Sequence, residues 1–371
     1  MIKSGLTNKR YRTLGSLTLF LTMVLGPFAS AFSAAAAQEV TGNIQGEVRD
    51  QQGAVIPGAT VTAASARRSF NTTTNREGLY RFNGLLPGVY TMSAAAKNFS
   101  DAKVENVTVE LGKTLNIVVE LKAAGTAESV TVTGASEPIV DVTSTKVATN
   151  VTQQQIDVLP KGLGFSSIIN VAPGTRNEMN AGGFQIDGAS GSENRFVVDG
   201  LDVTRVFGGM LGSTKNIPYD FVEEVQIKSA GYEAEFGGAT GGVINVVTRS
   251  GANIWHGEVR TDFNNQTFRG KDNPDLRRQL TDLTKAQYFL NPSGKDTTRL
   301  FAPTVTFGGP VWKDRMWFFA SYAPEFFRQQ QKLDLISVTS GALAEATLNS
   351  RLLNQTVKND YFIARLDYSP Y

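Results

Sequence analysis

The sequence of 371 residues has no cysteine and a single histidine, His256. Without a thiol there is no disulfide, no cysteine nucleophile and no thiolate ligand, so burial and hydrogen bonds alone must hold the folded domains together. A zinc site or a Ser-His-Asp triad would depend on that single imidazole, and no second ligand stands at a metal-binding spacing near it. We therefore predict no enzyme, no catalytic residue, no metal and no cofactor, and interpret His256 as an ordinary interfacial or lumenal residue of a strand.

Dense positive charge is also missing. The net charge is only +2, and the first 37 residues contribute four positive charges and no acid, so the rest of the chain is close to neutral. Binding to a phosphate backbone requires a stripe or patch of Lys and Arg. Nucleic acid is therefore not an expected partner.

The longest apolar stretch, residues 14–29, follows this basic start and precedes the alanines that end at Ala37. This order predicts a cleaved secretory signal peptide over residues 1–37, with cleavage near Ala37. The alternative is a membrane-spanning helix, which needs ~20 mainly apolar residues. Gly15, Gly26 and Pro27 interrupt the stretch and favour the signal peptide.

Residues 38–122 contain short β-type runs separated by turn residues, which predicts a β-sandwich. The expected strands cover residues 44–48, 59–63, 78–82, 88–93, 104–109 and 114–121. In the last strand, four apolar residues alternate with mainly polar ones, which is typical of a sheet with one buried face. They are Leu115, Ile117, Val119 and Leu121.

Residues 123–150 are rich in small residues and are interpreted as a linker. Inside it, valine alternates with threonine and serine in the segment Glu128, Ser129, Val130, Thr131, Val132 and Thr133. An extended strand of this kind can add to the open edge of another protein's sheet. The pattern equally suits the first strand of the next domain, and the residues alone leave both interpretations open.

Residues 151–250 predict a mixed α/β domain. Thr152 and Gln155 form a capping box before a short helix that ends at Pro160, and a second short helix is expected over residues 166–171. Asp199 and Gly200, between two apolar runs, predict a hairpin with a primed turn. Pro218 is expected to begin a helix that reaches residue 223.

A glycine cluster follows, with Gly237, Gly238, Gly241 and Gly242 ahead of the run 243–248 that contains Asn245. A phosphate-binding loop would open a helix, whereas this run is β-branched. We therefore predict close packing of backbone against backbone at these glycines.

Residues 251–371 predict strands of the length that crosses a membrane, with aromatic residues near the interfaces. One alternating face contains Trp255, Gly257, Val259, Thr261 and Phe263, and another contains Phe362, Ala364, Leu366 and Tyr368. Strands 304–311 and 316–326 flank a polar turn at 312–315, and Trp312, Trp317, Phe318, Phe319 and Tyr322 are expected to form an aromatic girdle. Residues 264–300 and 327–358 are interpreted as extracellular loops. A soluble sheet would alternate similarly, but such aromatic density is costly in water, at about 25 cal/mol per Å² of apolar area.

Two resemblances add to these predictions. The runs 46–50, 56–61, 77–82 and 86–90 resemble the carboxypeptidase regulatory-like domain, which implies a transthyretin-like, carbohydrate-binding-like fold without peptidase activity. The runs 184–188, 196–200, 222–227 and 232–248 resemble the plug domain of TonB-dependent receptors. The second resemblance implies a cell outer membrane location with lipid contact, energised uptake of a scarce small ligand (siderophore, oligosaccharide or peptide), and coupling to the periplasmic protein TonB through residues 128–133.

The expected fold class is therefore mainly β: a transthyretin-like sandwich, an α/β plug domain over 151–250, and an incomplete antiparallel transmembrane barrel over 251–371. The last 121 residues, at ~10 per strand, allow about six to eight strands, too few to surround a plug. We accordingly expect an amino-terminal fragment or a truncated reading frame. The alternative function is a secreted or surface carbohydrate-binding sandwich without transport activity.

Overall fold

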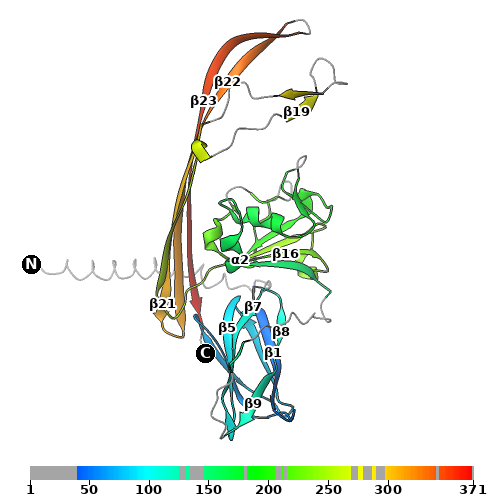
Figure 1. The fold of residues 1–371 in the computed structure, drawn as a ribbon, viewed down its shortest axis with the longest axis vertical. Coiled ribbons are helices and arrows are strands. Elements are labelled where there is room, and N and C mark those ends of the chain that lie inside the picture. Colours follow the sequence, from blue (N-terminus) through cyan, green and yellow to red (C-terminus); the bar gives the residue numbers. More distant parts are fainter. Residues whose placement is uncertain are drawn as a thin grey trace, which may run out of the picture.

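The computed structural model describes residues 40–124, 131–133, 145–178, 182–205, 210–212, 215–268, 275–278, 286–289, 297–339 and 342–369. The predicted signal peptide and residues 128–130 lie outside these ranges. Figure 1 shows three parts: a β-sandwich at one end, a central domain against it, and long strands that run beside the central domain and beyond it.

The amino-terminal part, which we call the sandwich, is built from two sheets. Their strand orders are β4-β1-β9-β6, with β8 also pairing with β1, and β10-β7-β5-β2-β3. Five of the six strands predicted from the sequence are present, the sixth is divided in two, and β3 and β6 are additional. The strands are β1 (Gly42–Asp50), β2 (Thr60–Ser65), β3 (Ser69–Thr73), β4 (Leu79–Leu85), β5 (Gly88–Ala95), β6 (Phe99–Ser100), β7 (Ala102–Val109), β8 (Thr114–Asn116), β9 (Val119–Ala123) and β10 (Thr131–Thr133).

The prediction of one unbroken strand over residues 114–121 is wrong, because it is divided into β8 and β9. At the break, Ile117 N donates to Gln45 O (2.8 Å) and Ile117 O accepts from the Tyr80 hydroxyl (2.8 Å). The predicted apolar face is nevertheless confirmed. Its side chains are buried, or packed against the core, at Leu115, Ile117, Val119 and Leu121.

The central domain is built on a mixed sheet with the order β11-β16-β17-β14-β15. β14 runs parallel to β17, while the β11–β16, β16–β17 and β14–β15 pairs are antiparallel. Its elements are β11 (Val147–Thr152), α2 (Gln153–Val158), η1 (Phe165–Val171), β12 (Thr175–Asn177), β13 (Phe184–Ile186), η2 (Gly191–Glu193), β14 (Arg195–Val198), β15 (Leu201–Asp202), η4 (Tyr219–Phe221), β16 (Val222–Ala230), η5 (Ala234–Phe236) and β17 (Val243–Thr248), where η marks a 3₁₀ helix.

The local predictions for this domain hold in part. The capping box before α2 is confirmed, with Thr152 N donating to the Gln155 side chain (3.0 Å). The second predicted helix is the 3₁₀ helix η1. The helix expected from Pro218 to residue 223 is wrong: a single 3₁₀ turn, η4, is followed by β16 from Val222 onward. Pairing of β16 with both β11 and β17 overrides the local helical signal.

The long strands form an antiparallel sheet with the order β18-β21-β22-β23, which we call the wall sheet. Its strands are β18 (His256–Asn265), β21 (Thr297–Trp312), β22 (Met316–Thr339) and β23 (Ala342–Tyr368). Beside it lie η6 (Gln266–Phe268) and a small hairpin of β19 (Asp275–Arg278) and β20 (Ala286–Phe289). The predicted loop over 327–358 is wrong for the described residues, because the backbone ladder of β22 and β23 continues from Met316–Tyr368 pairing to Thr339–Ala342. Polar side chains do not prevent strand pairing when a neighbouring backbone supplies the hydrogen bonds.

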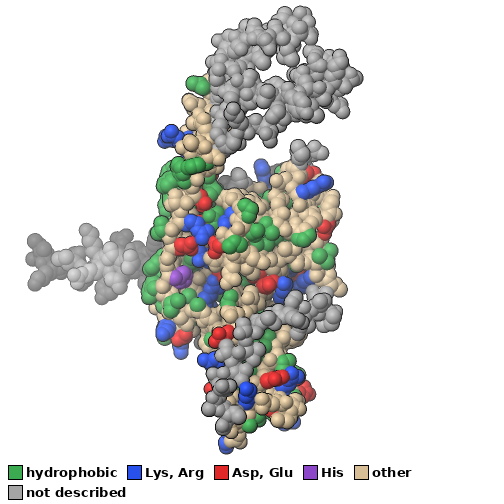
Figure 2. Space-filling view, viewed as in Figure 1, with side chains coloured by type: hydrophobic (Ala, Val, Ile, Leu, Met, Phe, Trp, Pro, Cys, Tyr) green, Lys and Arg blue, Asp and Glu red, His purple; other side chains and the backbone are tan. Residues whose placement is uncertain are grey.

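The two faces of the wall sheet differ in chemistry. On β21, Phe301, Val305 and Phe307 are exposed, whereas the residues between them, such as Thr304 and Thr306, are buried. The predicted girdle is therefore divided: Trp312 and Tyr322 are exposed, but Trp317 and Phe319 are buried on the other face. Figure 2 shows hydrophobic side chains gathered along this sheet.

The fold class predicted from the sequence is confirmed as mainly β. A β-sandwich precedes a domain with a mixed sheet, and an antiparallel four-stranded sheet resembling the start of a barrel follows.

Candidate functional site

The described part of the predicted docking strand, residues 131–133, pairs with the sandwich. Thr131, Val132 and Thr133 form β10, which pairs in parallel with Lys103–Glu105 of β7. Glu128, Ser129 and Val130 lie outside the described residues. The sheet of the central domain begins with β11, so β10 extends the sandwich rather than that sheet.

The predicted hairpin at Asp199 and Gly200 is confirmed. Val198 pairs with Leu201, and the two residues between them have φ values of 47° and 79°. Two positive φ values in a two-residue loop are typical of a type I′ turn, in which aspartate and glycine are favoured.

The Asp199 carboxylate connects this hairpin to two other elements. It accepts hydrogen bonds from Thr248 N (2.9 Å) and from the Thr248 hydroxyl at the end of β17. On β23, Arg365 Nη1 lies 3.5 Å from Asp199 Oδ1 and donates to Thr248 O (2.8 Å). Asp199 therefore links the central domain to the wall sheet.

The glycine segment packs tightly, but against side chains as well as backbone. A Cβ on Gly241 would lie 2.5 Å from Asn194 Oδ1, and a Cβ on Gly242 would lie 2.4 Å from Ile186 Cδ1. Gly238 has a φ of 88°, which a side chain disfavours, whereas Gly237 is not constrained in this way. The prediction of backbone packed against backbone is therefore wrong for Gly242, whose nearest contacts are all atoms of the Ile186 side chain. It holds only in part for Gly241, which meets the Asn194 and Ala189 side chains and the Glu193 backbone.

Asn245 lies inside β17 and is fully buried. It is in register with Val197 of β14 on one side and with Gln226 of β16 on the other.

A second link to the wall sheet centres on Arg260 of β18. Its guanidinium contacts Asp220 Oδ1 (3.1 Å) and Asp157 Oδ1 (3.1 Å) of the central domain, and Glu258 Oε1 (2.9 Å) of its own strand. Next to it, the Tyr219 hydroxyl donates to Asp262 Oδ2 (2.9 Å). Charged and polar groups of β18 therefore hold the 3₁₀ turn η4.

Burial controls the protonation of this turn. It raises the pKa of Asp220, which is only 7% exposed, while the positive charge of Arg260 opposes the change. Burial also raises the pKa of Tyr219 to about 12. The phenol therefore keeps its proton and remains a hydrogen-bond donor to Asp262.

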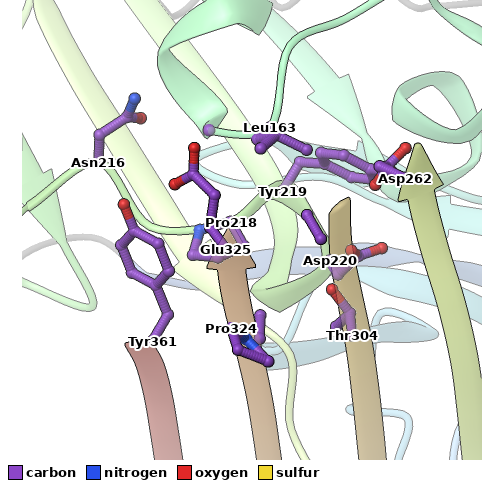
Figure 3. A pocket seen from close by; sticks show the side chains of 13 residues that line it. Leu163, Asn216, Pro218, Tyr219, Asp220, Asp262, Thr304, Pro324, Glu325 and Tyr361 are labelled. Carbon is purple, nitrogen blue, oxygen red and sulfur yellow. The ribbon is translucent and has the colours of Figure 1, made fainter. Parts of the chain in front are cut away.

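A cavity of about 320 Å³ lies between the central domain and the wall sheet, beside the Arg260 link. Figure 3 shows that Asn216, Pro218 and Tyr219 line one side, while strands of the wall sheet supply Glu325 and Tyr361 on the other. Glu325 accepts from Asn359 Nδ2 (2.9 Å). The carboxylates of its lining suit a ligand with hydrogen-bond donors.

Arg260 and Arg365 were not identified from the sequence. Each pairs with carboxylates far away along the chain, and no local motif marks them. One signal in the sequence could have found them. Both arginines alternate with apolar residues along their strands, so they lie on the face opposite the apolar one, and a charged residue that is buried there needs a partner.

Within the described ranges, no group of three or more potential metal ligands is present. His256 stands at the start of β18, with Nδ1 at 3.2 Å from Ile254 O. No helix among the described residues is both long and apolar enough to cross a membrane.

Two domain families match the chain. The carboxypeptidase regulatory-like domain matches residues 43–122, and the TonB-dependent receptor plug domain matches residues 138–243. The TonB-dependent transporter Oar of Myxococcus xanthus is 36% identical over 310 residues, which cover 80% of this chain. The match spans 28% of the length of that relative.

Solved structures are more distant. The outer membrane transporter YddB from Escherichia coli is 15% identical and has a TM-score of 0.44, with 60% of this chain and 31% of that chain covered. The siderophore receptor PirA from Acinetobacter baumannii is 16% identical and has a TM-score of 0.35, with 58% and 32% covered. From the two domain matches and the Oar relationship, the chain belongs to the TonB-dependent receptors that carry a carboxypeptidase regulatory-like domain in front of the plug.

Proposed function

We propose that this chain serves an outer-membrane transporter that takes up a scarce ligand with energy delivered by TonB. In this proposal the central domain is the plug, the wall sheet is the part of the barrel that faces it, and the sandwich lies in the periplasm. No covalent chemistry is involved. The receptor binds its ligand, and the plug blocks free diffusion until it is moved.

The contrast between the two faces of the wall sheet carries this proposal. The inward face holds the plug through Arg260 and Arg365 and buries Trp317 and Phe319. The outward face leaves Val259 75%, Phe263 57% and Phe307 48% exposed. Apolar area left in water costs about 25 cal/mol per Å², so a continuous apolar face is favoured against lipid.

The candidate TonB box is the segment 128–133. TonB would bind it by strand addition, with backbone hydrogen bonds supplying affinity. A pull on this segment reaches the plug at β11, its first strand. The ion pairs of Asp199, Asp220 and Asp157 with arginines of the wall sheet then determine how much of the plug moves.

The ligand is proposed to be a siderophore, an oligosaccharide or a peptide. The carboxylate-lined cavity beside Tyr219 and Glu325 favours a ligand that presents hydroxyl or amino groups to it.

The alternative function, carbohydrate binding by a secreted sandwich, has less support. Sugar-binding faces present exposed aromatic rings, but Tyr80, Phe82 and Tyr90 are buried in the sandwich core. The hydroxyls of Tyr80 and Tyr90 are also used internally, by Ile117 O and Leu86 O.

The test is disulfide crosslinking of the full-length receptor to TonB in cells. Because this chain has no cysteine, single cysteines can be placed at each position from 128 to 133 and paired with a cysteine in TonB. We expect a crosslinked product at several of these positions. A cysteine at Glu120, an exposed residue of β9, is the matched control and should give none.

Cell fractionation of the same receptor separates the alternatives. A transporter should be found with outer membranes. A product that is soluble after export, together with the absence of any TonB crosslink, would contradict the proposal and support the carbohydrate-binding alternative.

A further inference from the structure

One turn of the sandwich inserts its tip into the plug. Residues 110–113 follow β7, with Lys113 N donating to Glu110 O (3.3 Å) and Gly112 in the left-handed region at φ 66°. Glycine adopts this conformation without the cost of a side chain. The turn thereby presents Leu111, which is fully buried.

Side chains of the plug bind both backbone groups of Leu111. Its N–H donates to Glu224 Oε1 (3.0 Å), and its carbonyl accepts from Asn150 Nδ2 (2.9 Å) and Gln226 Nε2 (2.7 Å). Asn150 also donates to Glu224 Oε1 and accepts from Gln226 Nε2 (3.2 Å). These side chains therefore form one network around a single residue of the sandwich.

The network spans two neighbouring strands. Asn150 belongs to β11 and lies in register with Gln226 of β16, and Glu224 is the partner of Thr152. β11 is an edge strand whose one neighbour in the plug sheet is β16. The Leu111 turn is thus fastened across the β11–β16 pair, at the edge where the chain enters the plug.

Two further contacts hold the sandwich in this position. Arg67, in the turn after β2, forms an ion pair with Glu223 of β16, and its Nη1 donates to Pro87 O (3.0 Å). The guanidinium carbon of Arg68 lies 4.1 Å from the ring centroid of Trp317 on the wall sheet, a distance at which a cation–π attraction operates.

We propose that the sandwich is a clamp on the plug: the Leu111 turn, held by Glu224, Asn150 and Gln226, keeps β11 paired with β16 until the sandwich lifts away. The source of the lifting force rests on the proposed function, because TonB would pull on residues 128–133, which come before β11 (Val147–Thr152) in the chain. The clamp itself is a property of the resting receptor.

The clamp is also expected to respond to pH. Glu224 is 1% exposed, its Oε2 has no hydrogen-bond partner among the described residues, and burial raises its pKa to about 7. Two carboxylates close to Glu224 raise its pKa further: Glu223, which is paired with Arg67, and Glu110, which is paired with Lys113. β11 itself has no charged residue.

The direction of the pH dependence follows from the difference in the Glu224 pKa between the docked and the lifted sandwich. Lifting the sandwich exposes Glu224 and returns its pKa towards the ordinary value of 4.5. Because the docked state has the higher pKa, docking is strongest below that ordinary value and weakens as the pH rises through about 7. A protonated Glu224 also gains a donor on the strand face that it shares with Gln226, whose Oε1 has no partner within the described residues.

Hydrogen–deuterium exchange of the purified full-length receptor, without TonB or ligand, tests the clamp. Glu224→Ala removes the acceptor of Leu111 N–H and Asn150. We expect amide exchange in β11 to accelerate about tenfold, because the buried Leu111 N–H is left without its acceptor, with β17 unchanged. Glu224→Gln retains an acceptor, so β11 should stay protected. The wild type is expected to lose protection between about pH 4.5 and pH 7, and this loss should disappear in Glu224→Gln.

Arg67→Ala weakens docking from the sandwich side and leaves the plug sequence intact, so it should also accelerate β11. Glu120→Ala, an exposed change elsewhere on the sandwich, is the control and should not. The clamp is overturned if β11 exchanges at the wild-type rate in both Glu224→Ala and Arg67→Ala, or if β17 accelerates equally. TonB crosslinking at residues 128–133 would be unaffected by that outcome, so the two proposals fail separately.

Discussion

The plug is held on two sides by contacts of different chemistry. Towards the wall sheet, the guanidinium groups of Arg260 and Arg365 meet carboxylates. Towards the sandwich, one carboxylate, Glu224, and two amides bind the backbone of Leu111. Arginine remains charged at every physiological pH, whereas a buried carboxylate with mostly neutral partners can change its charge near neutrality.

The difference indicates a division of tasks. The contact with the wall sheet, through two arginines and their carboxylate partners, holds the body of the plug. The contact with the sandwich lies across the pair of the edge strand β11 with β16 and is weakened by a rise in pH towards 7. Release of the entry strand is therefore separable from release of the plug, and three changes test that separation.

The largest effect is expected for Arg260→Ala. It leaves Asp220, which is 7% exposed, as a buried charge without its guanidinium, and breaking a buried pair from one side costs about 3 kcal/mol. The plug should unfold at lower urea concentration in the full-length receptor, as followed by a fluorescent reporter in β17. The control Lys358→Ala removes an exposed ion pair with Asp360 and should leave the midpoint in place. A wild-type midpoint for Arg260→Ala would show that this contact does not hold the plug.

An intermediate effect is expected at Asp199. Asp199→Ala removes the acceptor of two hydrogen bonds from Thr248 and places alanine at positive φ. The free energy of unfolding, measured in the same urea titration, should fall by about 2 kcal/mol. Asp199→Asn keeps an acceptor, and asparagine is tolerated at positive φ, so only the charge towards Arg365 is lost. The free energy of unfolding should fall by less than about 1 kcal/mol. Equal losses for the two variants would assign the effect to the Arg365 pair instead.

The smallest effect is expected from pH on the sandwich contact. Arg68 covers Trp317 only while the sandwich is docked, so the fluorescence of Trp317 reports docking when Trp255 and Trp312 are replaced by phenylalanine. Burial raises the pKa of Glu224 from 4.5 to about 7, so docking, and with it the emission, should change between about pH 4.5 and pH 7. Glu224→Gln should remove the change. An identical titration in both proteins would exclude Glu224 as its cause.

Features set by neighbouring residues could be predicted from the sequence. The type I′ turn at Asp199 and Gly200, the capping box at Thr152 and the alternating faces of β18 and β21 all depend on local chemistry. The glycine cluster likewise indicated that space is short at Gly241 and Gly242, although the atoms that fill it belong mainly to side chains and not to the predicted backbone.

Features that depend on distant partners were missed. The helix expected after Pro218 is replaced by β16, because strands on both sides pair with it. The network around Leu111 joins residues more than 100 positions apart, and Leu111 follows β7 as an ordinary apolar turn residue. The strand pairing after residue 327 could not be predicted, because the polar composition of this stretch does not reveal that β23 pairs with it.

The central claim is that the wall sheet has one face for lipid and one for the plug. Adjacent positions on β21 test it directly: Val305 is 48% exposed and Thr306 is 4% exposed. Residues 1–371 contain no cysteine, so a cysteine introduced at 305 or at 306 of the full-length receptor is the one site for a fluorophore in this part of the protein. The labelled receptor is then studied in the outer membrane. Nitroxide-labelled lipids should quench the fluorophore at 305 and not at 306. Quenching of the fluorophore at 305 by a water-soluble quencher, with no effect of the labelled lipids, would contradict the account.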